Sequence, residues 1–219
     1  MAVAKKRPSV GSKRPVPPRR SPTPRGVGRK KTLKAKAKAV TDPDQDRLSY
    51  IRGLIRDVPD FPSPGIVFKD ITPLLADARG FHMTIDSFAE QLIELDFDTI
   101  VGIESRGFIF GAPLALRLNK RFVPIRKPGK LPWKSDRVSY ELEYGSGELE
   151  IHRDAVRKGS RVVIIDDLLA TGGTAGAAAE LVGRRGGLVV SFAFVIELGF
   201  LGGARKLGST RPISLLQYD

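Results

Sequence analysis

Two adjacent carboxylates and a glycine-rich turn lie within one short stretch, VVIIDDLLATGGT, at residues 162–174. Its apolar run predicts a buried strand that ends at Asp166 and Asp167, and the turn predicts the start of a helix. Carboxylates accept hydrogen bonds from hydroxyls, whereas a glycine-rich helix start gathers backbone N–H groups around an anion. A sugar phosphate satisfies both groups. The phosphate-binding residues assigned to the turn are Ala170, Thr171, Gly172, Gly173 and Thr174.

The alternative for this stretch is a capped turn in which Asp is a local acceptor. That alternative accounts for an Asp pair by itself. It does not account for the full order of apolar run, acidic pair, two apolar residues and Ala-Thr-Gly-Gly-Thr. We therefore interpret the stretch as a sugar-phosphate site.

Two further segments place charged residues where a strand is expected to end. GIESRGF puts Arg106 at the start of a helix, and a guanidinium suits phosphate geometry; a salt-bridged loop is the alternative. RKPGKLP follows another strand, where a solvated charge cluster is the alternative. Ligands of open α/β sheets bind at the carboxyl ends of strands, so we expect these segments to meet there. The residues assigned to a second anion, pyrophosphate, are Glu104, Ser105, Arg106, Arg126 and Lys130.

The elements that position these segments alternate between strand and helix. Apolar periodicity and cap residues predict helices within 41–58, at 78–95, 107–118 and 174–184. Strands are expected at 97–103, 122–127, 161–167 and 188–196, and a proline-rich loop with a short extended piece at 61–75. Because these strands are apolar throughout, we expect an α/β fold with a parallel sheet covered by helices on both faces.

Residues 130–152 interrupt this alternation. Polar and apolar residues alternate there around Gly145-Ser146-Gly147, which predicts an antiparallel hairpin and a candidate flap. Trp133 is expected to be a buried anchor of that flap.

The net charge of +13 is concentrated at the N-terminus. Residues 1–40 contain 14 of the 37 Lys and Arg residues and none of the 24 Asp and Glu residues, so residues 41–219 are nearly neutral. This proline-rich segment cannot bury enough apolar surface to offset its ordering entropy, which predicts a disordered tail at 1–40 and one domain at 41–219. A solvated tail and a weak polyanion contact are equal alternatives for its role, and a targeting presequence is disfavoured by its prolines.

Hydropathy, cysteine content and the positions of the histidines exclude several classes of protein. No apolar run approaches the about 20 residues that span a bilayer, and no secretory signal is evident, so we expect a cytoplasmic protein. The absence of cysteine excludes thiolate catalysis, disulfides and thiolate zinc sites. His82 and His152 are 70 residues apart and have no His or Cys neighbour, so no metal held directly by the protein is expected.

Together these motifs resemble the type I phosphoribosyltransferases. VVIIDDLLATGGT is similar to the family's signature for phosphoribosyl pyrophosphate. FPSPGIVFKDITPLL, GIESRGFIFGAPLA, RKPGKLP, SYELEYGSGELEI and SLLQYD resemble, in the same order, the members that act on adenine. The likeness runs from about Leu48 to Asp219, and residues 133–138 fit it poorly.

The resemblance implies the family's fold and a purine-salvage reaction. The phosphoribosyl group passes from 5-phosphoribosyl-1-pyrophosphate to adenine, giving AMP and pyrophosphate, with Mg²⁺ carried by the substrate and with a homodimer as the assembly. It implies that the turn at 170–174 holds the 5′-phosphate, that Asp166 and Asp167 face the ribose hydroxyls and that residues 104–106 hold pyrophosphate.

The resemblance also implies an adenine pocket and a reacting flap. Val67, Phe68 and Lys69 correspond to the adenine pocket, with Phe68 stacking and the backbone reading the base edge. Glu143 and Tyr144 correspond to the flap residues near the reacting centre. Glu143 is the candidate for managing the proton on the base.

Two alternatives stay open from the sequence. One is a transcriptional regulator that senses phosphoribosyl pyrophosphate without catalysis, although residues 1–40 lack the apolar periodicity of a folded DNA-binding domain. The other is a transferase for a different purine base, which would locate the error around Phe68.

Overall fold

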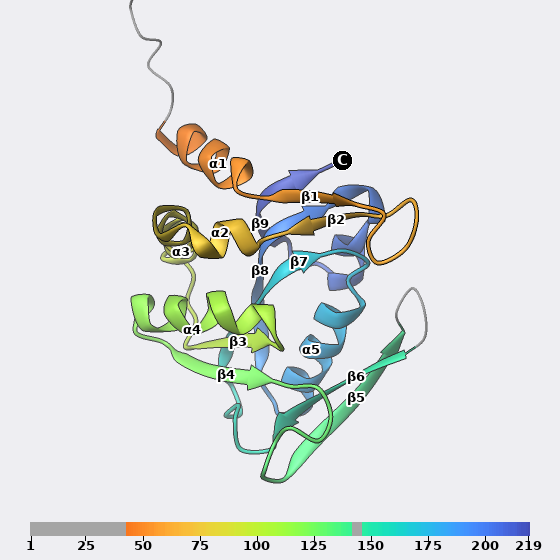
Figure 1. Cartoon of the computed structure of the whole chain (residues 1–219). Helices are drawn as coiled ribbons and strands as arrows, with labels where there is room; N and C mark the ends of the chain where they lie inside the picture. Colours follow the sequence, from red (N-terminus) through yellow and green to blue (C-terminus); the bar gives the residue numbers. More distant parts are fainter. Residues whose placement is uncertain (1–42, 142–145) are drawn as a thin grey trace, which may run out of the picture. The chain divides into compact units, whose positions relative to one another are not determined.

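The computed structural model describes residues 43–141 and 146–219. The predictions for residues 1–40, Glu143 and Tyr144 therefore lie outside the described residues. Within them, a five-stranded sheet forms the centre of the fold (Figure 1). Its strands, in spatial order, are β4 (Arg121–Ile125), β3 (Thr99–Ile103), β7 (Arg161–Leu169), β8 (Leu188–Leu198) and β9 (Pro212–Tyr218).

Every pairing in this sheet is parallel, as the apolar strand sequences predicted. Strand β9 was not predicted from periodicity. It pairs with β8 at the sheet edge, where Phe194 lies opposite Ser214 and Leu198 opposite Tyr218. The last two residues of β7 and β8 also extend beyond the predicted ends, so Leu168, Leu169 and Leu198 are strand residues.

Both faces of the sheet are covered, which confirms the predicted layers. Val163 and Ile165 of β7 pack in one core cluster with helices of one face, and Val162 and Ile164 pack in the other cluster. The first face carries α1 (Pro43–Gly53), α2 (Thr72–Ala76), α3 (Ala78–Leu92) and α4 (Arg106–Leu118). The second face carries α5 (Gly173–Arg184) and the hairpin of β5 (Ser135–Glu141) and β6 (Ser146–His152) (Figure 1).

The predicted antiparallel hairpin is confirmed by the pairing of β5 with β6, from Ser135 opposite His152 to Glu141 opposite Ser146. A single bridge between Arg126 and Glu150 joins it to the segment after β4. The expected burial of Trp133 is wrong, since this side chain is 62% exposed. It lies in the turn that precedes β5, outside the packed strands of the flap.

The segment between α1 and α2 is more regular than predicted. It forms a second antiparallel hairpin of β1 (Arg56–Pro59) and β2 (Val67–Asp70), with Asp57 opposite Lys69. Two short 3₁₀ helices, Gly199–Leu201 and Gly203–Leu207, follow β8 and were not predicted either. The β1–β2 hairpin and the first of these 3₁₀ helices contribute residues to a pocket at the carboxyl end of the sheet.

Candidate active site

The carboxyl ends of β3 and β7 bring the two predicted anion motifs together. A side chain at Gly107 would place a Cβ 2.5 Å from the carbonyl oxygen of Ile165, so glycine lets α4 begin directly against β7. Arg106 is thereby placed beside the acidic pair, with its Nε 2.9 Å from Oδ2 of Asp167. The prediction that these two strand ends meet is confirmed.

The acidic pair is short of positive charge. Asp167 is only 2% exposed, and its backbone N–H donates to Oδ1 of Asp166 at 2.9 Å. Burial and the neighbouring negative charge of Asp167 raise the pKa of Asp166 well above its ordinary value. Burial also raises the pKa of Asp167, and Arg106 opposes this only in part. The pair is therefore suited to a ligand that brings hydroxyl donors or positive charge.

The glycine-rich turn is held in a shape that other residues could not adopt. Gly172 has a φ of +79°, and a Cβ there would lie 2.4 Å from the carbonyl oxygen of Gly203. No side chain caps the start of α5 at Gly172. Among the residues that the structure describes, no side chain therefore caps the first N–H groups of this helix, which is the arrangement that binds phosphate at helix N-termini.

The third predicted segment forms a cationic loop, residues 126–130, whose charges converge on Glu104. Glu104 accepts hydrogen bonds from Arg126 Nε at 3.1 Å, Lys130 Nζ at 2.9 Å and the backbone N–H of Lys127 at 2.9 Å. Burial alone would raise its pKa, but these donors lower the pKa from 4.5 to about 2. The Glu104 carboxylate therefore orders the cationic loop, while the cations keep further donors for an anion.

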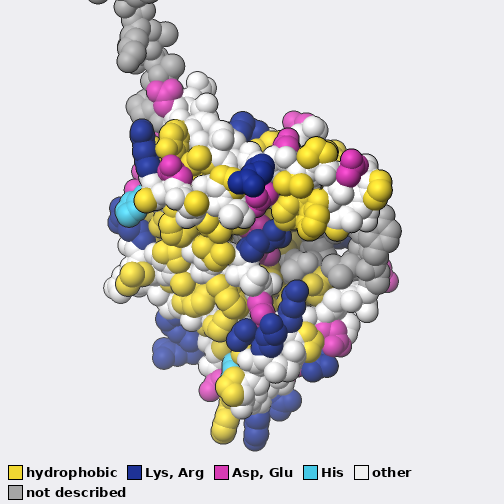
Figure 2. Space-filling view, viewed as in Figure 1, with side chains coloured by type: hydrophobic (Ala, Val, Ile, Leu, Met, Phe, Trp, Pro, Cys, Tyr) yellow, Lys and Arg dark blue, Asp and Glu magenta, His cyan; other side chains and the backbone are white. Residues whose placement is uncertain are grey.

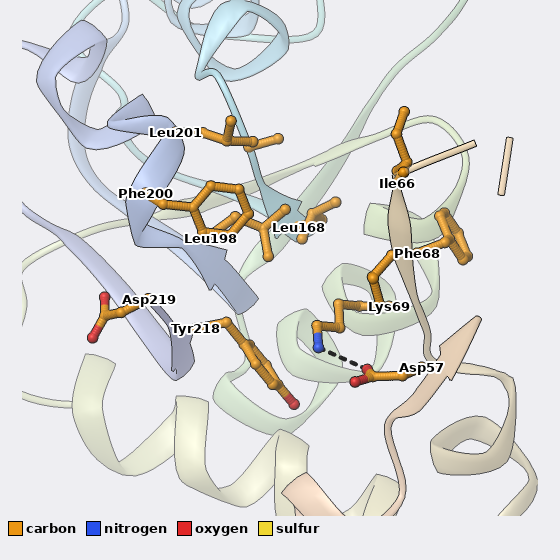
Figure 3. A pocket seen from close by; sticks show the side chains of 13 residues that line it. Asp57, Ile66, Phe68, Lys69, Leu168, Leu198, Phe200, Leu201, Tyr218 and Asp219 are labelled. Carbon is orange, nitrogen blue, oxygen red and sulfur yellow. Dashed lines mark hydrogen bonds and ion pairs between the residues drawn. The ribbon is translucent and has the colours of Figure 1, made fainter. Parts of the chain in front are cut away.

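A cavity of about 550 Å³ opens between β2 and the ends of β7, β8 and β9. The three residues predicted for the base pocket, Val67, Phe68 and Lys69, all line it (Figure 3). Lys69 points to Asp57, with Nζ 2.7 Å from Oδ1, and lies 4.1 Å from the centre of the Tyr218 ring. Asp57 thus neutralises the charge of Lys69 at the pocket wall. The ammonium group is therefore not available to a ligand, and β2 can contribute its backbone groups instead.

The aromatic ring of Phe68 links this cavity to the anion sites. It packs edge-on against Phe61 at 5.3 Å between ring centres, and the Arg106 guanidinium lies 5.6 Å from its centre. On the face shown in Figure 2, basic and acidic side chains lie next to one another between areas of hydrophobic side chains. A ligand with an apolar ring and a charged tail matches this arrangement.

Comparisons with known proteins agree with this geometry. Residues 74–212 match the family model of the phosphoribosyl transferase domain. A curated adenine phosphoribosyltransferase of Sorangium cellulosum is 57% identical over 175 residues, which cover 78% of this chain and 88% of the relative. The crystal structure of the Thermoanaerobacter pseudethanolicus enzyme of that name is 55% identical, with a TM-score of 0.76, covering 78% of this chain and 99% of the other.

The chain belongs to the adenine phosphoribosyltransferase family. A third relative carries a ligand: the Saccharomyces cerevisiae adenine phosphoribosyltransferase was solved with an imino-altritol bisphosphate and adenine. It is 43% identical, with a TM-score of 0.75, and the match covers 78% of this chain and 99% of the other. The family resemblance read from the motifs is confirmed.

Most residues in the far wall of the cavity were not predicted from the sequence. That wall consists of Leu168, Leu198, Phe200, Leu201 and Tyr218. Leu168 could have been found, because it follows Asp166 by two positions in a strand and so shares its face. The others come from the unpredicted end of β8, the first 3₁₀ helix and β9, where no periodic signal identified an element.

Acidic and histidine residues of this family member do not form a protein-held metal cluster in the described ranges. Within residues 43–141 and 146–219, no group of three or more His, Cys, Asp or Glu is placed to hold an ion. Asp167 pairs with Arg106, and Glu104 is surrounded by three donors. Carboxylates that are already paired in this way fit a Mg²⁺ ion that takes most of its ligands from substrate phosphates and water.

Among the described helices of this family member, none combines the length and the apolar character that crossing a bilayer requires.

Proposed function

We propose that the chain transfers the phosphoribosyl group of 5-phosphoribosyl-1-pyrophosphate to adenine, releasing pyrophosphate and forming AMP in purine salvage. One observation carries the proposal: all four features lie at the carboxyl edge of one sheet. An uncapped helix start, a charge-deficient acidic pair and a cationic loop lie at the ends of β3, β4 and β7, and a partly apolar cavity opens at the ends of β7, β8 and β9. These four features match the phosphate, ribose, pyrophosphate and base of the two substrates. Family membership and the adenine-bound yeast relative support the same assignment.

The uncapped start of α5 is assigned to the 5′-phosphate. Residues 170–174 surround this helix start, and the N–H groups of Gly173 and Thr174 belong to its first turn. Asp166 and Asp167, further upstream in β7, are assigned to the ribose 2′ and 3′ hydroxyls. Their negative charge also favours the positive charge that develops at the anomeric carbon as the bond to pyrophosphate breaks.

Pyrophosphate is assigned to residues 104–106 and to the cationic loop. Arg126 and Lys130 would bind it through their remaining donors, with Glu104 holding both in place. Arg106 is 39% exposed and retains guanidinium donors beyond the one paired with Asp167. It can therefore bridge the ribose carboxylates and the leaving group.

Adenine is assigned to the 550 Å³ cavity, with the backbone of β2 reading its edge at Val67 and Lys69. Leu168 lies in the wall opposite β2 and provides an apolar surface for one face of the base (Figure 3). Phe68 is assigned to stacking, as the family resemblance implies. Its ring contacts Phe61 and Arg106, so it contributes at the side of the cavity nearest the ribose.

Glu143 and Tyr144 are assigned to the reacting centre, with Glu143 managing the proton on the attacking nitrogen of adenine. Support comes from the described residue just before them. The carbonyl oxygen of Glu141 would lie 2.8 Å from a Cβ at Gly173, so β5 ends against the start of the phosphate helix. A flap that begins there can exclude water from the activated sugar.

Mg²⁺ is proposed to arrive on phosphoribosyl pyrophosphate and to neutralise charge on the leaving pyrophosphate. Asp166 and Asp167 would hold it indirectly, through ribose oxygens or water. We further propose a cytoplasmic homodimer, with a domain at 41–219 and with residues 1–40 making a weak polyanion contact through their excess of Lys and Arg.

The test is pyrophosphate release from phosphoribosyl pyrophosphate with Mg²⁺, supplying adenine, hypoxanthine, guanine, xanthine and orotate separately. Turnover with adenine alone is expected. Turnover with another base would keep the sugar-phosphate assignments and overturn the assignment of the cavity. No turnover with any base, in protein that binds phosphoribosyl pyrophosphate, would refute catalysis.

A further inference from the structure

We propose that Glu150 is a positioning residue that fixes the cationic loop and thereby sets the affinity for pyrophosphate and phosphoribosyl pyrophosphate. Glu150 lies in β6 of the flap hairpin and is only 5% exposed. Its segment, SYELEYGSGELEI, carries the family resemblance, but this residue has no role among those assigned to the reaction. The inference rests on the proposed function, in which Arg126 and Lys130 bind pyrophosphate. It adds to Glu104 a second carboxylate that holds the same loop by hydrogen bonds.

The side chain of Glu150 joins the cationic loop to the neighbouring strand of the flap, β5. Its Oε1 accepts hydrogen bonds from Nε and Nη2 of Arg137 at 2.9 and 2.6 Å. Its Oε2 accepts the backbone N–H of Gly129 at 3.1 Å. Both oxygens of one buried carboxylate are therefore engaged, one by the flap and the other by the cationic loop.

The backbone of Glu150 holds the other end of the same loop. Arg126 N donates to Glu150 O at 2.9 Å, and Glu150 N donates to Arg126 O at 2.7 Å. Between these anchors the chain reverses at Gly129, whose φ is +75°. This reversal returns Lys130 to Glu104, so the Gly129 hydrogen bond fixes where the Lys130 ammonium lies.

Glu104 and Glu150 thus hold the cationic loop by different atoms. Glu104 binds the side chains of Arg126 and Lys130 and the backbone N–H of Lys127, whereas Glu150 binds the backbone at Arg126 and Gly129. Closely spaced cations repel one another, and ordering them only on ligand binding would cost affinity. A loop held at both ends before the ligand arrives avoids that cost.

Arg137 extends this connection to the phosphate helix. Its Nη1 pairs with Oε2 of Glu148 at 3.1 Å, and its carbonyl oxygen accepts from Nη1 of Arg184 in α5 at 3.0 Å. Glu150 therefore lies between the helix assigned to the 5′-phosphate and the loop assigned to pyrophosphate. This network therefore connects α5, which is assigned to the 5′-phosphate, with the cationic loop, which is assigned to pyrophosphate at the other end of the same substrate.

The test compares Glu150→Gln with Glu148→Gln. An amide has one acceptor oxygen, so in Glu150→Gln an NH₂ group faces either the Gly129 N–H or the Arg137 guanidinium. Glu148 is the matched control, because it pairs with the same Arg137 and Ser139 on the flap but makes no contact with the loop through its side chain. Both variants remove one charge from β6.

For Glu150→Gln we expect about a tenfold rise in the KM for phosphoribosyl pyrophosphate and in the Kd for pyrophosphate, as loss of a charge-assisted hydrogen bond predicts. The KM for adenine should change less than about twofold, since the base cavity has no contact with this network. Glu148→Gln should leave all three constants within about twofold. A purely structural role would instead lower the amount of active enzyme and leave the constants unchanged.

Two further variants keep the test decisive if Glu150→Gln does not fold. Arg137→Gln removes the other partner at a side chain that is 49% exposed, and should raise the KM for phosphoribosyl pyrophosphate but not that for adenine. In a Lys130→Met background the effect of Arg137→Gln should shrink, because the cation that Glu150 positions is gone. Equal effects in both backgrounds, or equal effects on both substrates, would overturn the inference. Wild-type protein that fails to use adenine would instead overturn the proposed function.

Discussion

Glu104 directly follows β3, and Asp166 and Asp167 lie near the carboxyl end of the neighbouring strand β7, yet the two sites differ in the positive charge that surrounds them. Glu104 receives three donors, two of them cationic, and its pKa is lowered to about 2. The aspartate pair shares one guanidinium, that of Arg106, and burial raises the pKa of both carboxyls. One acidic group is already satisfied, and the other is held short of a partner.

This difference separates two uses of a carboxylate in one active site. A satisfied carboxylate fixes the positions of cations before the ligand binds, and its own charge does not change during the reaction. A carboxylate pair that lacks positive charge is unfavourable in the free protein, and gains most when positive charge develops next to it. Under the proposed function, this difference favours a role in binding for Glu104 and a role in turnover for the aspartate pair.

The largest effect is expected from the aspartate pair. Asp166→Asn or Asp167→Asn should lower kcat by roughly 10²-fold, since each removes charge that stabilises the transition state. The free energy of unfolding at pH 7 should not fall for Asp166→Asn, because its ionised form is opposed by burial and by Asp167. Steady-state kinetics and urea unfolding test this, with exposed Asp154→Asn as the control. Unchanged kinetics in both variants would remove the ribose-facing role.

A smaller effect of a different kind is expected from Glu104→Gln. The KM for phosphoribosyl pyrophosphate should rise about tenfold with kcat changed far less, because Arg126 and Lys130 lose the acceptor that positions them. The free energy of unfolding should fall by about 2 kcal/mol, as donors in a half-buried network lose a partner. Glu180→Gln is the control, since its exposed pair with Arg184 is worth under about 0.5 kcal/mol. If kcat fell as much as for the aspartate variants, the comparison would fail.

The pH dependence of stability should have opposite signs for the two sites. The pKa of Glu104 is lowered, so its stabilisation is complete above its ordinary pKa of 4.5 and is lost as pH falls toward about 2. The pKa of Asp166 is raised, so folding carries no penalty below its ordinary pKa of 3.8 and a growing one as pH rises beyond it. Urea unfolding between pH 3 and 7 should show wild type losing its advantage over Glu104→Gln at low pH. Over the same range, wild type should fall behind Asp166→Asn as pH rises, and parallel curves for the three proteins would contradict both assignments.

Local signals in the sequence were enough to locate the end of β3, and to locate that of β7 to within two residues. An apolar run followed by charged residues and a glycine-rich helix start is contiguous, so Asp167 and Arg106 could each be assigned without knowing that they pair. The opposite wall of the cavity could not be found in this way. Tyr218 reaches it from β9, whose pairing with β8 depends on residues far away in the chain.

The electrostatic roles were also beyond the sequence. Glu104 was assigned to pyrophosphate by its position, and only the structure shows that its partners are Arg126 and Lys130, 22 and 26 residues away. Glu150 belongs to a segment that resembles the family, but its position alone gave it no role, because a glutamate in an alternating strand is usually a solvated residue. Its burial arises from a bridge between two segments whose contact no local pattern encodes.

The smallest effect on catalysis is expected from deleting residues 1–40, although this segment holds the largest concentration of basic residues. Residues 1–40 hold 14 Lys and Arg residues, more than any site described above, yet no acidic partner in that segment positions them. Deleting this segment should leave kcat and the KM for phosphoribosyl pyrophosphate within about twofold, since binding depends on cations that Glu104 holds in place rather than on total charge. The same deletion should abolish the salt-sensitive binding of the protein to nucleic acid, measured by fluorescence anisotropy between about 50 and 200 mM salt. A tenfold loss of substrate affinity in the shortened chain would mean that basic residues of 1–40 also bind the substrate. It would weaken the argument that affinity depends on Arg126 and Lys130, which Glu104 holds in place.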